Sequence, residues 1–330
     1  MGSHILSSME SLLSRALTER PYAPIFITIF FAILVSIAGA ISHTLPQAQV
    51  FTPEGEGVSA QAHAGLLNAL ILVIPAAGGS FIILYLIRKG RLNLLLSLYK
   101  FLFFLLSSMV FYFIGDIPLY LIQSRTIPYF PGYFLSYRAV LYSLNWDAPF
   151  AVGVTVSAIV ASQLFSPYSD RRRKNTSLMV LSGILGGFMA VTLPTWTVLI
   201  VLLLLSAYDI YAVFYGPIKE ITSMSVRGSP AVVEPRDIFS SLVYQGKEWE
   251  LGMGDLVFYS LLTSHAAYYG FTNPVMGELS WALFLFPVLL SLLVGFYITE
   301  RLLERIPLLP GLPIPMGMGV GTFLALLLIL

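Results

Sequence analysis

Long runs of apolar residues alternate with short polar segments along the whole chain. A helix needs about 20 apolar residues to cross the hydrocarbon core of a bilayer, and the chain contains about nine runs near that length. The pattern therefore predicts an all-α, polytopic membrane protein with about nine transmembrane helices. The predicted spans are residues 24–45, 64–87, 92–115, 148–165, 177–193, 196–216, 251–270, 279–299 and 314–330.

Composition strengthens this prediction and removes several other classes of protein. Hydrophobic residues make up 57% of the chain and charged residues 11%, a balance typical of membrane proteins. A formal net charge of +1 offers no surface for nucleic acid. The absence of cysteine excludes disulfides, thiolate catalysis and Cys-ligated zinc, and the four histidines lack the spacing of metal ligands. We expect a lipid bilayer as the surroundings, and neither a cofactor nor a metal.

The basic residues lie on one side of the predicted membrane. With the N-terminus in the cytoplasm, all of the 18 Lys and Arg residues except Arg125 and Arg138 fall in cytoplasmic segments. Because cytoplasmic loops carry an excess of positive charge, this alternation predicts a cytoplasmic N-terminus and an external C-terminus. We expect a multi-pass protein of the cell membrane, or of an endomembrane if the cell is eukaryotic.

The predicted spans divide the chain into parts. Residues 1–8 resemble a remnant of protein expression. Residues 9–216 hold the first six spans, residues 217–250 form a cytoplasmic loop rich in Gly, Pro and charge, and residues 251–330 hold the last three spans. The longest external connection, residues 116–147, is rich in Tyr, Phe and Pro, which predicts an interfacial segment with aromatic anchors.

Two acidic residues stand out because apolar sequence surrounds them within predicted spans. Asp209 lies in the sixth span, and Asp255 opens the seventh. A charge at such a position costs a few kcal/mol at least, so it indicates function. The two spans run in opposite directions, and a rise of about 1.5 Å per residue brings both carboxylates to a similar depth near the cytoplasmic side. We therefore expect them to face one another.

Paired carboxylates in a medium of low dielectric cannot both ionise cheaply, so the pair is expected to share a proton and to titrate as a unit. This is the arrangement of aspartic proteases, in which one carboxylate activates a water and the other protonates the peptide carbonyl. The residues alone leave two alternatives open. The acids could form a proton or cation relay in a transporter or channel, or they could be unrelated structural residues.

The sequence flanking the acids favours the protease. Gly252 and Gly254 remove side chains beside Asp255, which lets another backbone approach, although small residues also serve plain helix packing. Residues 309–313 read Leu-Pro-Gly-Leu-Pro at the entrance of the last span. Prolines leave backbone groups without helical partners, and such backbone lies at membrane depth only inside protein or beside a wet cavity. A serine protease based on Ser80 and His265 is disfavoured, because no glycine follows the serine to complete the motif.

These motifs together resemble the presenilin and signal peptide peptidase family of intramembrane aspartyl proteases. The resemblance rests on Tyr208-Asp209, Gly252-Met253-Gly254-Asp255 and the proline-rich segment before the last span, in the expected order. It covers roughly residue 64 to the C-terminus. The local sequence is closer to presenilins, and the compact chain resembles a microbial, archaeal-type homologue. The cytoplasmic placement of both acids also agrees with presenilins, whereas signal peptide peptidases have the inverted topology.

The resemblance implies the roles of individual residues. Asp209 and Asp255 would be the catalytic pair of an intramembrane-cleaving aspartic endopeptidase. The sequence departs from the family's motifs at two positions. Gly311 stands where the family has alanine, and Met253 replaces the more usual leucine. The substrates would be transmembrane helices of other proteins, and the oligomeric state is left open. Residues implied to contact substrate are Tyr208, Gly252, Met253, Gly254, Pro310, Gly311 and Leu312.

A peptide bond inside a transmembrane helix is shielded by its own hydrogen bonds, so cleavage requires local unwinding. The loop before Leu251 and the broken stretch at 310–315 offer backbone that could hold an unwound substrate by strand addition. This hypothesis rests on the shared location of the two segments near the acids.

Overall fold

The computed structural model describes residues 22–42, 45, 47–55, 57–126, 135–166, 168–217, 219, 240–246, 249–274, 277–306 and 309–330, with side chains described outside 119–148. Within these residues, nine long α-helices build the fold. They are α2 (Tyr22–Ser42), α3 (Val58–Arg88), α4 (Leu92–Thr126), α5 (Leu135–Phe165), α6 (Arg171–Thr192), α7 (Thr195–Phe214), α10 (Met253–Thr272), α11 (Ser280–Leu303) and α12 (Pro313–Ile329).

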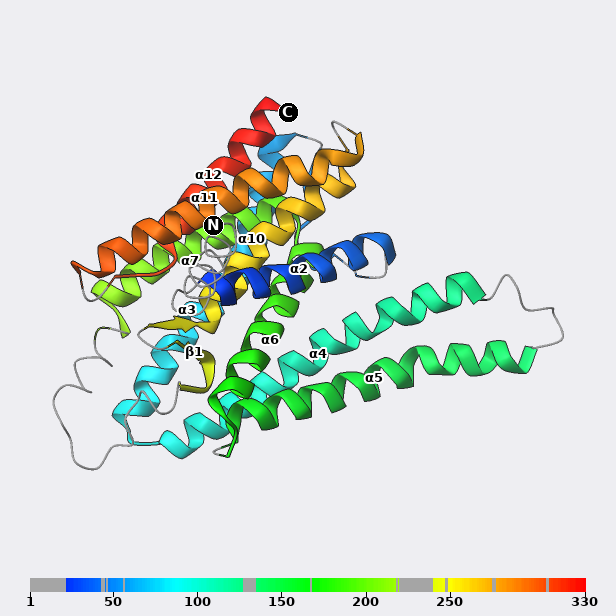
Figure 1. Ribbon diagram of the computed structural model, residues 1–330, viewed down its shortest axis with the longest axis horizontal. Helices are drawn as coiled ribbons and strands as arrows, with labels where there is room; N and C mark the ends of the chain where they lie inside the picture. Colours follow the sequence, from blue (N-terminus) through cyan, green and yellow to red (C-terminus); the bar gives the residue numbers. More distant parts are fainter. Residues whose placement is uncertain are drawn as a thin grey trace, which may run out of the picture.

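Helix α10 lies at the centre of the packed part of the molecule. It contacts α6, α2 and α11 extensively, and it also touches α7 and α12. Figure 1 shows α7, α10, α11 and α12 gathered together, while α4 and α5 pair with each other and extend to one side. Helix α3 packs mainly against α7. Every helix that contributes to the site described below thus belongs to the group around α10.

Close helix packing around α10 depends on small residues. A Cβ atom built on Gly186 of α6 would lie 2.9 Å from the backbone nitrogen of Leu261 on α10. A Cβ atom on Gly187 would lie 2.4 Å from the carbonyl oxygen of Ala32 on α2. Only glycine permits these approaches, which is the usual device for helix contact in membranes. The core beneath them is apolar and includes the fully buried Leu256 and Leu262.

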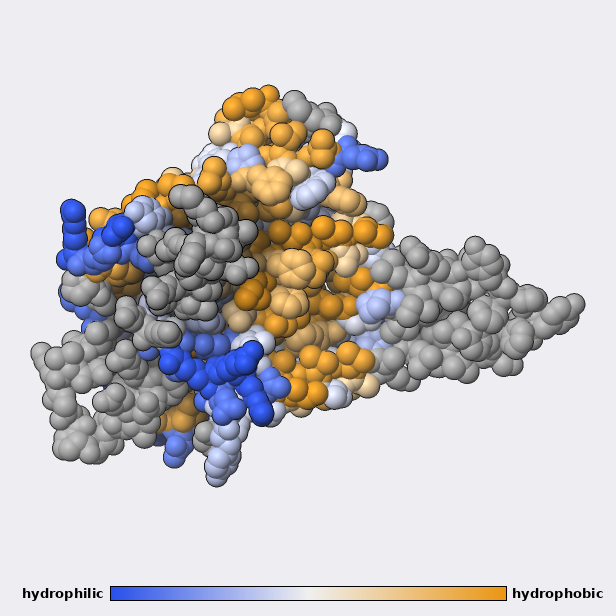
Figure 2. Space-filling view, viewed as in Figure 1, coloured by the Kyte–Doolittle hydropathy of each residue, from blue (hydrophilic) through white to orange (hydrophobic). Residues whose placement is uncertain are grey.

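The outer surface has the apolar character expected of a membrane protein. Figure 2 shows hydrophobic residues in a broad area across the molecule, with hydrophilic residues gathered mainly near its edges. Six helices among the described residues are long and apolar enough to cross a membrane, by length and composition alone. They are α2, α3, α6, α7, the first part of α4 (Leu92–Pro118), and α11 with the turn before it (Gly277–Leu303). The prediction of an all-α polytopic membrane protein is confirmed, while the number of spans and the sides of the termini stay predictions.

Several helices are longer than the apolar runs that predicted them. Helix α4 continues to Thr126 and α5 begins at Leu135, so most of the expected external connection at 116–147 is helical. A helix can extend beyond the hydrocarbon core into water, and hydropathy alone does not mark where it ends. The aromatic segment 129–134 lies outside the described residues, as does most of the predicted cytoplasmic loop at 217–250.

A short hairpin precedes α10, and the sequence did not predict it. Strand β1 (Val243–Gln245) pairs antiparallel with β2 (Glu250–Gly252), so that Tyr244 lies opposite Leu251. The single turn η2 (Ser240–Leu242) leads into this hairpin, and a similar turn, η3 (Gly277–Leu279), leads into α11. Strand β2 runs directly into α10 at Met253, so the hairpin fixes where that helix begins.

Candidate active site

Helices α7 and α10 carry the two acids and lie next to each other. Helix α7 begins after Pro194, whose ring suits a helix start, and it places the partly buried Asp209 in its last two turns. Helix α10 begins after Gly252 and carries Asp255 in its first turn. An acid in the first turn is favoured by the partial positive charge at a helix N-terminus.

The two carboxylates form one site. They are close enough to interact electrostatically. The backbone N–H of Leu312 donates a hydrogen bond to Oδ2 of Asp209 at 3.2 Å, and the backbone of Gly311 also interacts with that carboxylate. Asp255 interacts in turn with the backbone of Gly252. Backbone donors from two different segments therefore hold the pair.

The segment before α12 contacts both acids. It is non-helical from 309 to 312, and α12 starts at Pro313. A Cβ atom on Gly311 would lie 3.3 Å and 3.4 Å from the two carboxylate oxygens of Asp255. The missing side chain at this position thus lets the segment lie directly against the carboxylate. Pro310 and Leu312 on either side are buried, which fixes the segment between the two helices.

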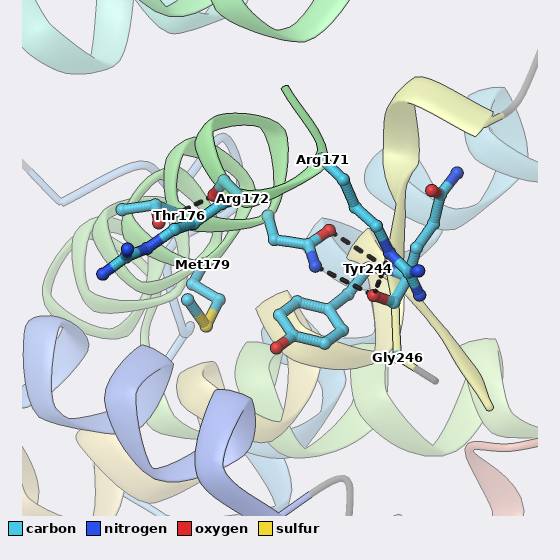
Figure 3. Close-up of a pocket in the computed structure, with 8 residues that line it drawn as sticks. Arg171, Arg172, Thr176, Met179, Tyr244 and Gly246 are labelled. Atoms are coloured by element: carbon cyan, nitrogen blue, oxygen red, sulfur yellow. Dashed lines mark hydrogen bonds between the residues drawn. The ribbon is translucent and has the colours of Figure 1, made fainter. Parts of the chain in front are cut away.

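The hairpin before Asp255 is anchored to the start of α6. The side chain of Asn175 donates to the carbonyl oxygen of Gln245 at 2.9 Å and accepts from the N–H of Gln245 at 3.1 Å. Nε of Arg171 donates to the same carbonyl at 2.9 Å. Figure 3 shows these contacts in a pocket between α6 and β1. The amide of Asn175 thereby occupies the outer edge of β1 as a neighbouring strand would.

Aromatic stacking stiffens the same hairpin. The rings of Tyr244 and Trp249 stack across it, with centroids 5.2 Å apart and planes 7° from parallel. Partial burial raises the pKa of the Tyr244 phenol, and the neighbouring Arg171 and Asn175 partly offset that rise. The phenol accordingly stays neutral over the physiological range and acts through its ring.

Comparisons with known proteins agree with this architecture. No family model matches the chain. Presenilin-B of Dictyostelium discoideum is 30% identical over 154 residues, which are 44% of this chain and 29% of that protein. The chain thus matches less than a third of the length of this curated relative. A solved presenilin family intramembrane aspartate protease superposes with a TM-score of 0.53 at 16% identity, over 92% of this chain and 97% of that one.

The chain is presenilin-like. One stretch of its sequence is similar to Presenilin-B, and its fold is similar to that of a presenilin family intramembrane aspartate protease. At 16% identity the structural match speaks for the fold alone. The roles of individual residues therefore rest on the geometry of this site.

Other predicted site residues of this presenilin-like chain lie at different distances from the acids. A Cβ atom on Gly252 would lie 3.4 Å from Oδ2 of Asp255, whereas one on Gly254 would meet only the ring of Phe258, at 3.9 Å. Met253 packs against the core. The hydroxyl of Tyr208 points to α3, where it is hydrogen-bonded to Ser80. Of the two glycines, only Gly252 adjoins the carboxylate.

Two residues of the site were missed by sequence reasoning. Tyr259 on α10 is buried, and its hydroxyl donates to the carbonyl oxygen of Gly311 at 3.0 Å. It lies four residues after Asp255, so both share one face of the helix, and that spacing is a signal that could have found it. Asn175 on α6 is the second, and its contact with Gln245, 70 residues away, carries no local signal.

Proposed function

We propose that this protein is an intramembrane aspartyl protease that hydrolyses peptide bonds within or near transmembrane segments of other membrane proteins. The observation that carries the proposal is the joint site of Asp209 and Asp255, on adjacent helices and in contact with one backbone segment at Gly311 and Leu312. The presenilin-like fold and the match to Presenilin-B support the same reading.

In the proposed reaction the two carboxylic groups act as a base and an acid. The ionised carboxylate takes a proton from a water, whose oxygen attacks the carbonyl carbon of the substrate. The protonated carboxyl gives its proton to the carbonyl oxygen. The resulting gem-diol collapses, the C–N bond breaks, and a proton passes to the amine that leaves. No covalent intermediate with the protein forms.

The contacts between the segment 309–312 and the two acids are compatible with these base and acid roles. The N–H of Leu312 donates a hydrogen bond to one oxygen of Asp209, which fixes the orientation of the carboxylate. The absent side chain at Gly311 lets this backbone segment lie directly against the carboxylate of Asp255. Preorganised groups of this kind cost no rearrangement during the reaction.

The hairpin supports the hypothesis that an unwound substrate adds as a strand. It places extended backbone immediately before Asp255, and main-chain hydrogen bonds are the usual source of affinity in strand addition. The side chain of Asn175 already bonds the N–H and the carbonyl oxygen of Gln245 on the outer edge of β1. We therefore expect the substrate to add along β2. Replacing Glu250 with proline removes an N–H from β2 and should impair cleavage of a helical substrate. Unchanged cleavage would contradict the hypothesis.

The catalytic proposal is tested with purified protein in lipid vesicles that contain a transmembrane test peptide, with products identified by mass spectrometry. Asp209→Asn and Asp255→Asn should each reduce the rate by about a thousandfold or more, because each removes an acid or base from the reaction. Asp170→Asn is the matched control, since Asp170 is an exposed acid at the start of α6. Its rate should not change.

Persistent cleavage in both aspartate variants would refute the protease. The competing function, a proton or cation relay in a transporter or channel, would give no cleavage by the wild-type protein. It would instead give ion movement across the vesicle membrane that either substitution stops.

A further inference from the structure

The hydroxyl of Tyr259 contacts the segment between the two acids from the side opposite Asp209. The Tyr259 side chain is 1% exposed, which makes it one of the most completely buried large side chains of the described chain. Its ring meets Phe296 of α11 edge-on, with centroids 6.0 Å apart and planes at 78°. This packing holds the ring, so the hydroxyl that bonds the Gly311 carbonyl has a fixed position.

Two hydrogen bonds of this segment fall on a single peptide group. The carbonyl oxygen of Gly311 accepts from Tyr259 at 3.0 Å, and the N–H of Leu312 donates to Asp209 at 3.2 Å. These atoms belong to one planar peptide unit, in which C=O and N–H point in opposite directions. Fixing the oxygen therefore also fixes the direction of the N–H.

Glycine makes this peptide unit depend on such an anchor. Because Gly311 has no Cβ, its backbone samples more conformations than that of any other residue, so the plane between 311 and 312 can rotate unless it is held. The flanking Pro310 and Pro313 supply no N–H for further backbone bonds. Accepting a bond from the tyrosine also polarises the peptide, which strengthens the bond that its N–H donates.

We propose that Tyr259 is a positioning residue that orients the carboxylate of Asp209 through the Gly311–Leu312 peptide. The proposal rests on the proposed function for its effect on catalysis, whereas its structural part stands independently. Helix α10 would thus contribute one acid directly and, through Tyr259, also set the geometry of the acid on α7. Without the hydroxyl, the peptide plane rotates and Asp209 loses the hydrogen bond donated by Leu312.

The substitution Tyr259→Phe tests this, because it removes one hydroxyl and keeps the ring packed against Phe296. We expect kcat to fall about tenfold, which is the effect of losing one hydrogen bond in the transition state, while KM stays within about twofold. Tyr269→Phe is the matched control. Tyr269 lies on the same helix and packs its ring against Phe284, and its hydroxyl makes no hydrogen bond among the described residues. Its kcat should not change.

Hydrogen–deuterium exchange gives a readout that does not depend on proteolysis. Prolines 310, 313 and 315 have no exchangeable amide, so a peptide covering 309–315 reports on Leu312 and few other residues. Exchange in this peptide should rise several-fold in Tyr259→Phe, stay unchanged in Tyr269→Phe, and stay unchanged elsewhere along α10.

Two results would overturn the proposal. Unchanged exchange at 309–315 would show that the hydroxyl does not hold the peptide, and a normal kcat despite faster exchange would show that holding it does not serve catalysis. If the wild-type protein cleaves no test peptide, the proposed function fails, and the exchange experiment still decides whether Tyr259 anchors the segment.

Discussion

The central helix α10 and the outer helix α3 show opposite relations between hydropathy and burial. Helix α3 is among the most apolar helices of the described chain, yet only 17% of its most apolar window is buried. Helix α10 is not apolar enough to count as a span by composition, yet most of its residues are buried, among them Ser260, Thr263, Ser264 and His265. Lipid demands apolar side chains, whereas surrounding protein can satisfy polar ones.

The polar side chains of α10 illustrate how protein replaces lipid around this helix. His265 bonds the carbonyl oxygen of Ala190 at 2.7 Å and the hydroxyl of Thr195 at 3.2 Å, which joins α10 to the end of α6 and the start of α7. Thr263 bonds the carbonyl oxygen of Tyr259 within its own helix. The comparison shows that the proposed catalytic helix sits in a protein interior, where α2, α6, α7, α11 and α12 surround it.

The largest difference in stability between the packed helices around α10 and the outer helix α3 is expected when a glycine in each region is replaced by alanine. In Gly187→Ala the new Cβ would lie 2.4 Å from the carbonyl oxygen and 2.9 Å from Cα of Ala32, so α6 and α2 must separate. We expect a loss of about 3 kcal/mol of stability, seen as a lower melting temperature in detergent. In Gly79→Ala on α3 the Cβ meets nothing within 4 Å, and stability should stay equal or rise by up to about 1 kcal/mol. Equal melting of the two variants would remove the distinction between the regions.

A smaller effect is expected where the hairpin joins the packed region. Asn175→Ala removes both of its hydrogen bonds to the backbone of Gln245 and leaves the bond from Arg171, so β1 should be held less firmly against α6 and Asp255 should be positioned less well. We expect cleavage to slow several-fold and stability to fall by about 1 to 2 kcal/mol. Thr176→Ala is the control, because among the described residues that hydroxyl bonds only the carbonyl of Arg172 in its own helix. Unchanged cleavage in Asn175→Ala would show that cleavage does not depend on the contact between Asn175 and the hairpin.

The smallest effect is expected at the contact between α3 and α7. Tyr208→Phe removes the hydroxyl that bonds Ser80 and approaches the carbonyl of Ala77. Because most of the apolar window of α3 is not buried within the protein, we expect less than about 1 kcal/mol in stability and about a twofold change in cleavage. Tyr211→Phe, on the exposed face of the same helix, should have no effect on either. A loss as large as that of Gly187→Ala would mean that α3 belongs to the packed region.

Much of the fold could be predicted because a bilayer imposes its thickness on every span. Apolar runs of about 20 residues predicted helices near all nine observed positions, and the prolines at 310–315 predicted a break that ends at Pro313. The hairpin escaped prediction because its three-residue strands show too little alternation to be recognised. The end of α4 and the start of α5 were not predicted because these helices continue beyond the apolar runs of their sequences.

The sequence by itself determined the class of protein and singled out the two acids as candidates for function. A carboxylate within an apolar run is too costly to lack a role. Tertiary structure alone decided how those acids are held. Tyr259 and Gly311 are 52 residues apart, and Asp209 and Leu312 are 103 apart. Such contacts depend on how α7, α10 and the segment before α12 pack, because the direction of a buried side chain follows from its neighbours in space. The peptide group between Gly311 and Leu312 acquires its place in the site only there.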